Sequence, residues 1–323
     1  MSKVTVIVAI YNVKDYLDAC LGSLMAQTYK DVEFMCVDDG STDGSKAIIE
    51  KYVALDERFK YYYKENGGLA DVRNFGIENS TSEYIMHMDG DDIADPKMVE
   101  AAVFYMDSFK LDMFIFGHRK VYPDGTKEVI HLEMENGIYN LRSNPEILAK
   151  TPNSSWGKIY RRELFERYDI RYPVGLHHED LATTYRLIFY AKKIGYEDRA
   201  LYDYAVGRVG NVTSTVDESI YDIIKVTDIL LNFYRDHEAF DMYYDELECL
   251  IERNYIFALR KAMRIKDRTF GDKFIDAVYR SKGHYFKRKN KKYRIERSKD
   301  DFIYRHRSLT KMYYHHVLRK GKR

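Results

Sequence analysis

The sequence is poor in cysteine and has no long apolar run, and each absence excludes a class of protein. Its three cysteines, Cys20, Cys36 and Cys249, are odd in number and lack metal or redox spacing, so neither a disulfide framework nor a zinc site is supported. Met1 leads straight into an apolar strand, without the charged start and apolar stretch of a signal peptide. No run approaches the roughly 18 apolar residues of a membrane span. We therefore expect a cytoplasmic protein whose membrane contact is at most peripheral.

The common nucleotide-binding loops are absent as well. Neither GxGxxG nor GxxxxGK[ST] follows any apolar run, which excludes the dinucleotide fingerprint and the P-loop. No internal repeat is visible. A nucleotide bound by this chain must therefore be held in another way.

The first half of the chain alternates short apolar runs with segments of helical periodicity. This alternation is typical of βαβ units and predicts an α/β fold with an open, mainly parallel (mixed) sheet flanked by helices. The apolar spacing is helical in the last third, so we expect a domain over 1–217 followed by a helical C-terminal extension over 218–323. One more helix is expected over 180–193. The predicted strands cover residues 4–9, 32–38, 60–64, 84–89 and 113–116.

Polar clusters fall at the carboxyl ends of three predicted strands. In open α/β sheets, ligands bind outside the carboxyl ends of the strands. The coincidence predicts a binding site along that edge of the sheet. The clusters are Tyr11-Asn12, Asp38-Asp39-Gly40-Ser41 and Asp89-Gly90-Asp91-Asp92.

The last of these clusters is a strongly acidic turn. Three carboxylates within four residues repel one another unless a cation or oriented donors neutralise them, and all-oxygen ligands favour Mg²⁺ or Mn²⁺. An acidic turn leading into a helix capped by Asp95 explains the same residues without any ligand. Both interpretations stay open, since Asp95 can cap while the other carboxylates bind.

Three further charged segments also have a structural and a functional interpretation. A carboxylate of the turn Asp38–Asp43 can accept the imide N–H of a uracil ring, although Asp43 is well placed to cap the next helix. Arg73 lies beside an apolar stripe and needs an anionic partner, which is either a strand-end aspartate or a diphosphate. Glu179 and Asp180 lie at an expected helix start, where the dipole keeps a carboxylate ionised; either can act as a general base or simply stabilise the first turn.

Taken together, these segments resemble glycosyltransferase family 2, a large group of inverting enzymes with the GT-A fold. The similarity extends over roughly residues 3–215, with the elements in the order that the family has them. These elements are the opening Val4–Asn12, the run Val37–Asp43, Asn66-Gly67-Gly68 with Arg73-Asn74, the DxD-like Asp89–Asp92, and the acceptor-side Trp156–Arg162 and Glu179-Asp180.

The resemblance implies particular roles for single residues. It also implies a nucleotide-sugar half over about 1–115 and an acceptor half over about 116–217. Ala205 stands where many members carry Arg, so the phosphate contacts of that segment are open, with Arg208 as the candidate substitute. In the implied site, Ala9, Tyr11 and Asp39 frame the base, Asn66 and Arg73 hold the nucleotide and its phosphates, Asp89 meets the ribose or metal shell, Asp91 binds the cation, and Asp180 is the catalytic base.

The implied activity is the inverting transfer of a sugar from a nucleotide-diphosphate donor, a UDP-sugar by preference, to an acceptor hydroxyl. Mn²⁺ or Mg²⁺ would serve this metal-dependent hexosyltransferase in the synthesis of a cell-surface polysaccharide or glycoconjugate. A glycan, a lipid-linked glycan or a protein could be the acceptor, and no nucleic acid is expected as a partner. A nucleotidyltransferase is one alternative, although its usual basic Gly-rich loop is absent. A catalytically silent nucleotide-sugar-binding subunit is the other, which the presence of Asp91 and Asp180 opposes.

The last forty residues are strongly basic. Residues 284–323 contain fifteen Lys or Arg against three acidic residues, a net charge of +12, while the rest of the chain sums to −11. Such asymmetry indicates binding to a polyanion or an anionic membrane face, although a solvated surface gives the same pattern. We expect the tail to hold the protein peripherally at the cytoplasmic membrane face, and the sequence leaves a homo-oligomer open. The tyrosines that suit a membrane interface are Tyr293, Tyr304, Tyr313 and Tyr314.

Overall fold

The structure is a computed structural model that describes residues 2–207, 217–288, 290, 292–293 and 306–320. Contacts divide the chain into two compact units: Met1–Gly175 with Thr183–Arg208, and Leu176–Ala182 with Val209–Arg323. The domain boundary at residue 217 stays a prediction. Two residues named in the sequence analysis, Arg208 and Tyr304, lie outside the described ranges, as do several basic residues of the tail, namely Lys289, Lys291 and Arg294.

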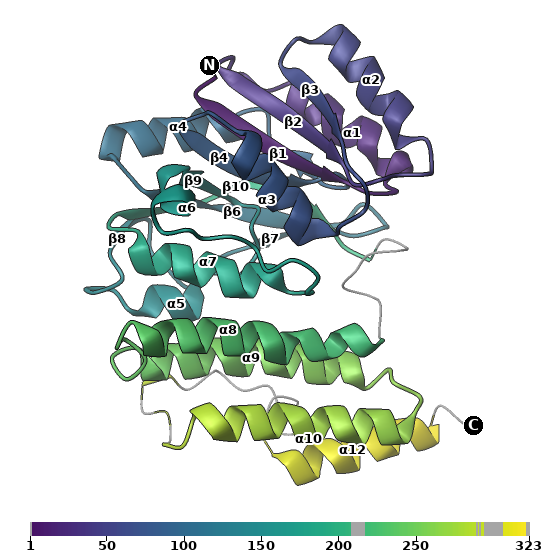
Figure 1. Cartoon of the computed structure of the whole chain (residues 1–323), viewed down its shortest axis with the longest axis vertical. Coiled ribbons are helices and arrows are strands. Elements are labelled where there is room, and N and C mark those ends of the chain that lie inside the picture. The colour runs from purple at the N-terminus through teal and green to yellow at the C-terminus, as the bar shows by residue number, and fades with distance from the viewer. Residues whose placement is uncertain (1, 208–216, 289, 291, 294–305, 321–323) are drawn as a thin grey trace. The chain divides into compact units, whose positions relative to one another are not determined.

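One mixed sheet forms the centre of the first unit (Figure 1). Its strands are β1 Val4–Ile10, β2 Val32–Asp38, β3 Phe59–Tyr63, β4 Tyr84–Asp89, β5 Ile93–Ala94, β6 Met113–Val121, β7 Lys127–Ile130, β8 Gly137–Tyr139, β9 Lys158–Arg161 and β10 Ile194–Ala205. They are ordered β3-β2-β1-β4-β9-β6-β10-β5, with β7 paired to β6 and β8 to β10. β1 to β4 are mutually parallel, and the side chains of β1, β2 and β4 are largely buried because helices cover both faces, whereas β3 at the edge buries only Phe59.

The strands in the second half of the sheet have their carboxyl ends at the same edge as the strands in the first half. β9 runs antiparallel to both β4 and β6, so β6 points the same way as β4, and β10 is parallel to β6. The carboxyl ends of β1, β2, β4, β6 and β10 therefore meet at the same edge. The predicted open, mainly parallel α/β sheet is confirmed. Four predicted strands match within one residue, while the fifth, predicted over 113–116, continues to Val121.

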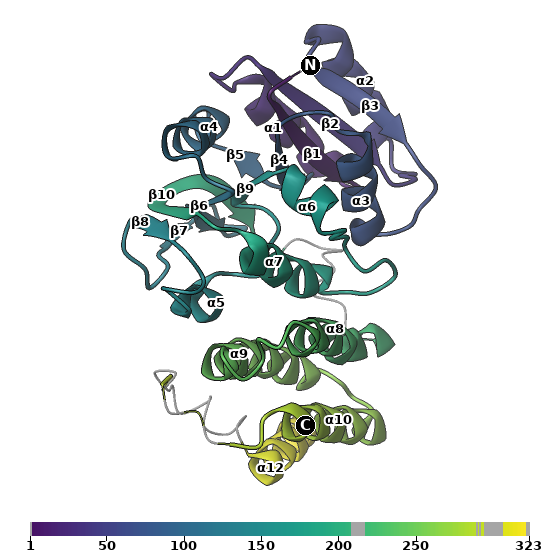
Figure 2. The same ribbon diagram turned by 60° about the vertical axis from the view of Figure 1, so that its left-hand side comes forward.

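Helices cover both faces of this sheet (Figure 2). α1 Lys14–Met25, α2 Ser45–Leu55 and α4 Met98–Phe109 share one core with Val6 and Val8. Because side chains alternate along a strand, Ile7 points to the other face, where α3 Leu69–Asn79 packs. A Cβ added to Gly76 of α3 would stand 2.6 Å from side-chain carbons of Ile7, so only glycine permits this close approach. The remaining helices are α5 Glu146–Lys150, α6 Glu163–Arg167 and α7 Glu179–Tyr190, the last close to its predicted range of 180–193.

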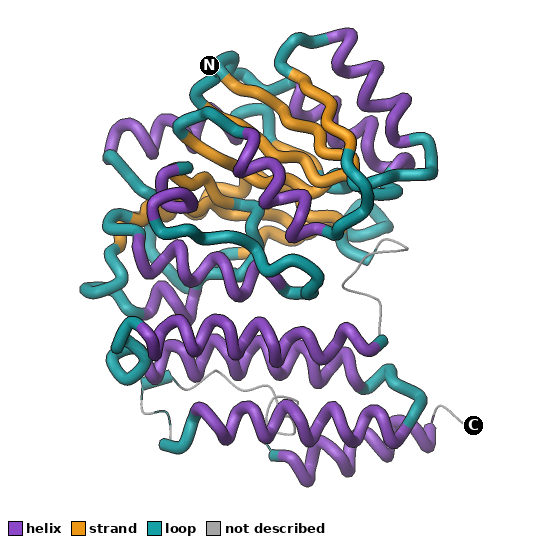
Figure 3. The backbone as a smooth tube through the Cα atoms, viewed as in Figure 1, coloured by secondary structure: helices purple, strands orange, loops and turns teal. Residues whose placement is uncertain are grey.

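The second unit is helical, as predicted for the C-terminal extension (Figure 3). A short 3-10 turn, η2 Glu218–Tyr221, precedes α8 Asp222–Asp236, α9 Tyr244–Ala262, α10 Arg268–Tyr285 and α12 Arg307–Lys320. Apolar residues at helical spacing are buried, among them Val226 and Leu230 of α8 and Leu247 and Ile251 of α9. None of the helices within the described ranges is long and apolar enough to cross a membrane.

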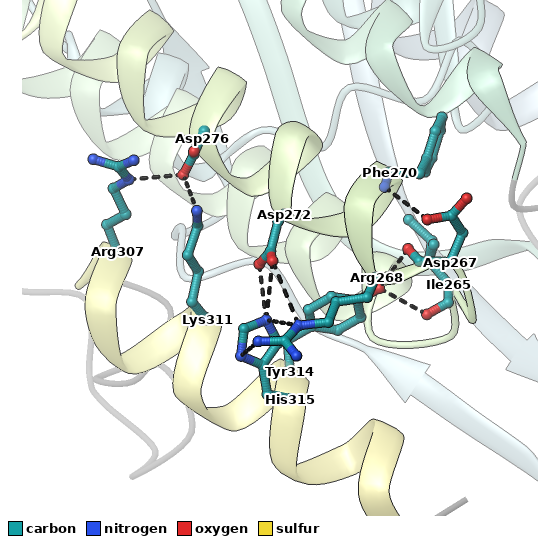
Figure 4. Close-up of polar contacts among 10 residues, drawn as sticks. All are labelled: Ile265, Asp267, Arg268, Phe270, Asp272, Asp276, Arg307, Lys311, Tyr314 and His315. Atoms are coloured by element: carbon teal, nitrogen blue, oxygen red, sulfur yellow. Dashed lines mark hydrogen bonds and ion pairs between the residues drawn. The ribbon is translucent and has the colours of Figure 1, made fainter. Parts of the chain in front are cut away.

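The basic tail is partly folded onto this unit (Figure 4). Arg307 and Lys311 of α12 both contact the Asp276 carboxylate of α10 at 2.7 Å. The Tyr314 ring is fully buried, and its hydroxyl donates to the carbonyl oxygens of Ile265 and Asp267, each at 2.9 Å. The expectation that Tyr314 suits a membrane interface is therefore wrong, because α10 covers it.

Candidate functional site

The carboxyl edge of the sheet gathers the strand-end residues that the sequence singled out. Ala9 is the register partner of both Val37 and Asp89, and its carbonyl accepts the backbone N–H of Gly90 at 2.9 Å. The Asp39 N–H donates to the Ile10 carbonyl at 2.8 Å. The strand ends of β1, β2 and β4 are thus held together by backbone hydrogen bonds. Beyond them, the Tyr11 ring is 50% exposed and open to a ligand.

Asp39 organises the loop that precedes α3. Its carboxylate is 2% exposed and accepts four hydrogen bonds: from Lys64 Nζ at 2.5 Å, Gly67 N at 2.9 Å, Gly68 N at 2.8 Å and Asn66 Nδ2 at 3.1 Å. A carboxylate offers about four lone-pair positions, so these donors occupy it fully. The structure brings the predicted Asp39 and Asn66 together, and it shows that Asp39 has a structural task of its own.

Arg73 is buried on α3 and meets a strand-end carboxylate. The residue is 3% exposed, and its Nη2 lies 3.3 Å from Oδ1 of Asp89. Its guanidinium also lies over the ring of Tyr172, 5.4 Å from the centroid. The aspartate, one of the two anionic partners left open by the sequence, is therefore in place. Because the Asp89 side chain is 25% exposed, this ion pair borders solvent.

The carboxylates of the acidic turn have different surroundings. Asp92 is fully buried; its Oδ2 accepts the Tyr202 hydroxyl at 2.6 Å and its Oδ1 accepts the Ala205 N–H at 2.8 Å. Burial raises the pKa of the Asp92 carboxyl well above its ordinary value, and the charges of Asp89 and Asp91 add to this effect. Asp92 thus fastens the turn to β10, whereas Asp89 and Asp91 are only partly buried. In the part of the chain that the structure describes, no three His, Cys, Asp or Glu side chains form a metal-ligating group.

An aromatic stack lies beside the acidic turn. The half-buried indole of Trp156 stacks on Tyr202 at 4.9 Å and Tyr204 at 5.1 Å between centroids, and His118 meets it edge-on at 4.9 Å. The buried Lys158 donates to the backbone carbonyls of Ser154 at 2.6 Å and Trp156 at 3.5 Å, which fixes the loop that carries the indole. The sequence indicated this segment only through its family likeness.

Asn74 connects α3 to a segment far along the chain, and sequence reasoning assigned it no role of its own. It is buried, its Nδ2 donates to the Tyr172 carbonyl at 2.8 Å, and its Oδ1 accepts the Tyr172 N–H at 2.8 Å. The amide satisfies both backbone groups of one residue, as a neighbouring strand would. The only signal in the sequence was its place directly after Arg73.

Asp180 lies in the first turn of α7, as predicted, and its Oδ1 accepts the Leu181 N–H at 2.8 Å. Its segment, Leu176–Ala182, belongs to the second unit. There the His177 N–H donates to Oδ2 of Asp222 at 3.2 Å, and the His178 ring meets Phe257 edge-on at 6.5 Å. The role of Asp180 as a base stays a prediction.

Several known proteins are similar in sequence to this chain. The model of a family described as "Glycosyl transferase family 2" matches residues 5–169. Glycosyltransferases GlyA and GlyG of Streptococcus pneumoniae are each 31% identical; the matches cover 63% of this chain and 30% of GlyA, and 66% of this chain and 73% of GlyG. The chain thus spans less than a third of GlyA.

Solved structures share the fold. S. aureus TarS in complex with UDP-GlcNAc superimposes with a TM-score of 0.74 at 23% identity, covering 100% of this chain and 92% of that one. The mannosyltransferase PcManGT of Pyrobaculum calidifontis, in complex with GDP-Man and Mn²⁺, gives a TM-score of 0.55 at 17% identity, covering 86% of this chain and 75% of that one.

Proposed function

This chain belongs to glycosyltransferase family 2, and on that premise we propose that it transfers a sugar from a nucleoside-diphosphate donor, preferably a UDP-sugar, to an acceptor hydroxyl with inversion. The observation that carries the proposal is the meeting of Ala9, Asp39 and Asp89 at one sheet edge. Open α/β sheets bind ligands at this edge. The UDP-GlcNAc complex of TarS supports UDP as the first nucleotide to test. A glycan, a lipid-linked glycan or a protein would supply the acceptor hydroxyl.

Asp91, together with Asp89, would hold a divalent cation. Mg²⁺ in such sites is commonly bound by one or two carboxylates plus substrate phosphates, so two protein ligands suffice. The chemistry of the two residues fits a cation, because both are partly exposed carboxylates in one turn and oxygen ligands suit Mg²⁺ or Mn²⁺. A bound cation would neutralise negative charge that develops on the departing diphosphate. The Mn²⁺ complex of PcManGT is in keeping with this assignment.

The nucleotide would be framed by Tyr11, Ala9 and the loop around Asp39. For Asp39 to accept a uracil imide, one of its four donors must leave. Lys64 is the donor best able to do so, because its Nζ also contacts Asp71 at 2.5 Å and keeps that partner. We infer that uridine binding releases Lys64 from Asp39 and leaves it on Asp71 and the Glu65 carbonyl, while Asn66 continues to shape the loop.

Arg73 would exchange its ion pair with Asp89 for one with the diphosphate of the donor. In the structure it pairs with Asp89 at 3.3 Å, and Asp89 borders solvent. A cation bound to Asp89 and Asp91 would compete with Arg73 for the same carboxylate. The guanidinium would then be available to the leaving phosphate, where stabilising developing charge has its largest effect on rate.

Asp180 is our candidate for the general base that takes the proton of the attacking hydroxyl. Asp180→Asn keeps the shape and removes the basicity, so we expect nearly unchanged UDP affinity and a loss of transfer of at least about a hundredfold. The measurement is sugar transfer at saturating donor, with UDP titrated calorimetrically into both proteins. Transfer near the parental rate would show that another group, such as Glu179, is the base.

The proposed reaction is separated from its alternatives by two assays. A thermal-shift screen of UDP-, GDP-, CMP- and dTDP-sugars with Mn²⁺ identifies the donor, since a ligand that binds the native state raises the melting temperature. Release of free nucleoside diphosphate is then followed with and without acceptor. Release that rises with acceptor supports the transferase, a silent subunit binds without release, and a nucleotidyltransferase releases pyrophosphate instead.

The same enzyme would act at an anionic membrane surface through its C-terminal tail. Lys292 pairs with Glu246 at 2.6 Å, and Arg307 and Lys311 pair with Asp276, so part of the basic charge is neutralised within the unit. Lys287 and Arg288 are exposed. Each basic residue near an anionic leaflet contributes about 1 kcal/mol.

A charge reversal tests this surface better than truncation, because truncation would remove the buried Tyr314. Lys287→Glu with Arg288→Glu should weaken sedimentation with anionic liposomes and leave neutral liposomes unaffected. The matched control reverses the exposed Lys266 and Lys273 of the same unit. Equal loss in both double variants, or binding that ignores lipid charge, would remove the membrane from the proposal.

A further inference from the structure

Lys120 lies near the carboxyl end of β6, on the face that carries the aromatic stack. β6 and β10 are parallel, with Tyr202 opposite His118 and Tyr204 opposite Lys120. Register partners in a sheet point to the same face, and alternate residues of one strand do so as well. His118 contacts the Trp156 indole directly. The Lys120 side chain therefore emerges beside the stack, at the edge where the acidic turn also lies.

On the other face of the same strands, the basic side chains are paired with a carboxylate. Arg119 and Lys127 both pair with the carboxylate of Asp203, Lys127 at 2.8 Å. Lys120, although only partly exposed, makes no ion pair or hydrogen bond with any residue that the structure describes. Its cross-strand neighbour on β7 is Glu128, whose carboxylate accepts the Tyr122 hydroxyl at 2.6 Å.

Two lysines lie near His118 of the stack. Burial, together with the charges of Lys158 and Lys120, lowers the pKa of His118 to about 4. Lys158 is buried against the backbone carbonyls of its own loop. Of these two lysines, Lys120 is thus the one that a ligand can reach. Its ammonium forms no ion pair within the described residues, so it is available to an anion that a ligand supplies.

We propose that Trp156 and Lys120 form a subsite for a sugar residue that carries a phosphate or carboxylate group. The half-buried indole offers an apolar surface to the sugar ring, and the ammonium of Lys120 binds its anionic substituent. This proposal rests on the proposed glycosyltransferase function and names the substrate class of its site. The anion comes either from a charged acceptor glycan or from the diphosphate on the donor sugar.

Trp156 provides the measurement, because it is the single tryptophan of the chain. Its fluorescence is titrated with glucose, glucuronate and glucose 6-phosphate in the full-length protein, in Lys120→Met and in Lys127→Met. UDP with Mn²⁺ is titrated calorimetrically into the same three proteins. Lys127→Met is the matched control, since that lysine lies one strand away on the opposite face. Lys120→Gln replaces Lys120→Met if the latter melts at a lower temperature than the parent.

The parent should bind the two charged sugars at least about tenfold more tightly than glucose, the effect of one charge-assisted hydrogen bond. Lys120→Met should lose this preference and Lys127→Met should keep it. Unchanged UDP affinity in Lys120→Met then assigns the anion to the acceptor, whereas weaker UDP binding assigns it to the donor diphosphate. Equal binding of charged and neutral sugars by the parent, with UDP affinity unaffected by Lys120→Met, overturns the subsite. If the subsite fails in this way but the parent still binds UDP, the proposed glycosyltransferase function is unaffected. If the parent selects charged sugars but binds no nucleotide, the proposed function is refuted and the subsite is not.

Discussion

At the scale of single residues, carboxylates that are neighbours in sequence have separate tasks. Asp92 is buried and fastens the acidic turn to Tyr202 and Ala205, which leaves Asp89 and Asp91 partly exposed beside it. Asp39 likewise holds four donors of the loop before α3. A carboxylate that is fully hydrogen-bonded shapes the site, and one that borders solvent is the better ligand for a cation.

His118 makes the aromatic stack sensitive to acid. Burial and two nearby lysines lower its pKa to about 4. The unfolded chain therefore binds a proton near pH 6.5 that the folded chain takes up only near pH 4, so stability from this group is complete above pH 6.5 and is lost as the pH falls towards 4. His118→Gln cannot take up the proton. We expect it to remove up to about 3 kcal/mol of the acid-induced loss in the free energy of unfolding.

Urea unfolding between pH 7 and pH 4.5 measures this difference. The control is His284→Gln, which replaces an exposed histidine of the second unit. The prediction fails if His118→Gln and the parent lose stability with the same slope over this range.

At the scale of elements, one side chain connects α3 to a segment that lies 98 residues further along the chain. Asn74→Ala would leave the buried N–H and carbonyl of Tyr172 without their partners, at a cost of about 2–5 kcal/mol. Asn79→Ala on the same helix removes an exposed amide that bonds only within the helix, and should cost less than about 1 kcal/mol. Urea unfolding of the two variants is the comparison. Equal losses would mean that the contact with Tyr172 contributes little.

Local patterns were sufficient to predict the parallel strands. β1 to β4 are short apolar runs bounded by polar turns, and their predicted ranges are confirmed within one residue. β6 was predicted too short because its last residues, from His118 to Lys120, are polar and do not look like a buried strand. His118 and Lys120 lie on the face of the aromatic stack and Arg119 on the other, where it pairs with Asp203, so both faces carry polar residues and the apolar strand pattern fails there.

Long-range pairing could not be predicted from the sequence. β9 was not recognised as a strand, because it has only four residues, and its insertion between β4 and β6 depends on partners far away in the chain. Periodicity could not predict the two hydrogen bonds between Asn74 and Tyr172 either, nor the backbone carbonyls that accept hydrogen bonds from Lys158. The motif residues at the strand ends could be named because each lies next to a recognisable strand.

At the scale of the whole molecule, the helical unit includes more than the C-terminal extension. Leu176–Ala182, which carries the candidate base Asp180, packs with it. Asp222 of α8 accepts a hydrogen bond from the backbone N–H of His177, and Phe257 of α9 contacts the ring of His178. These contacts fix the conformation of Leu176–Ala182 within the helical unit.

The last helix, α12, should contribute measurably to the stability of that unit. Tyr314→Phe removes the hydroxyl that donates to Ile265 and Asp267, and we expect a loss of about 1–2 kcal/mol together with faster hydrogen exchange in α12. The neighbouring Tyr313→Phe alters a ring that is 37% exposed and should stay within about 0.5 kcal/mol of the parent. Similar exchange rates in the two variants would mean that α12 is not held by its buried tyrosine.

The central claim is that the carboxyl edge of the sheet binds a nucleoside diphosphate with a cation at Asp91. Calorimetric titration of UDP, with and without Mn²⁺, into the parent and Asp91→Ala tests it most directly. We expect tight binding that requires Mn²⁺ in the parent, and loss of the Mn²⁺-dependent part in an Asp91→Ala protein whose circular dichroism is unchanged. Equal UDP affinity in the two proteins in the presence of Mn²⁺ would show that Asp91 does not bind the cation.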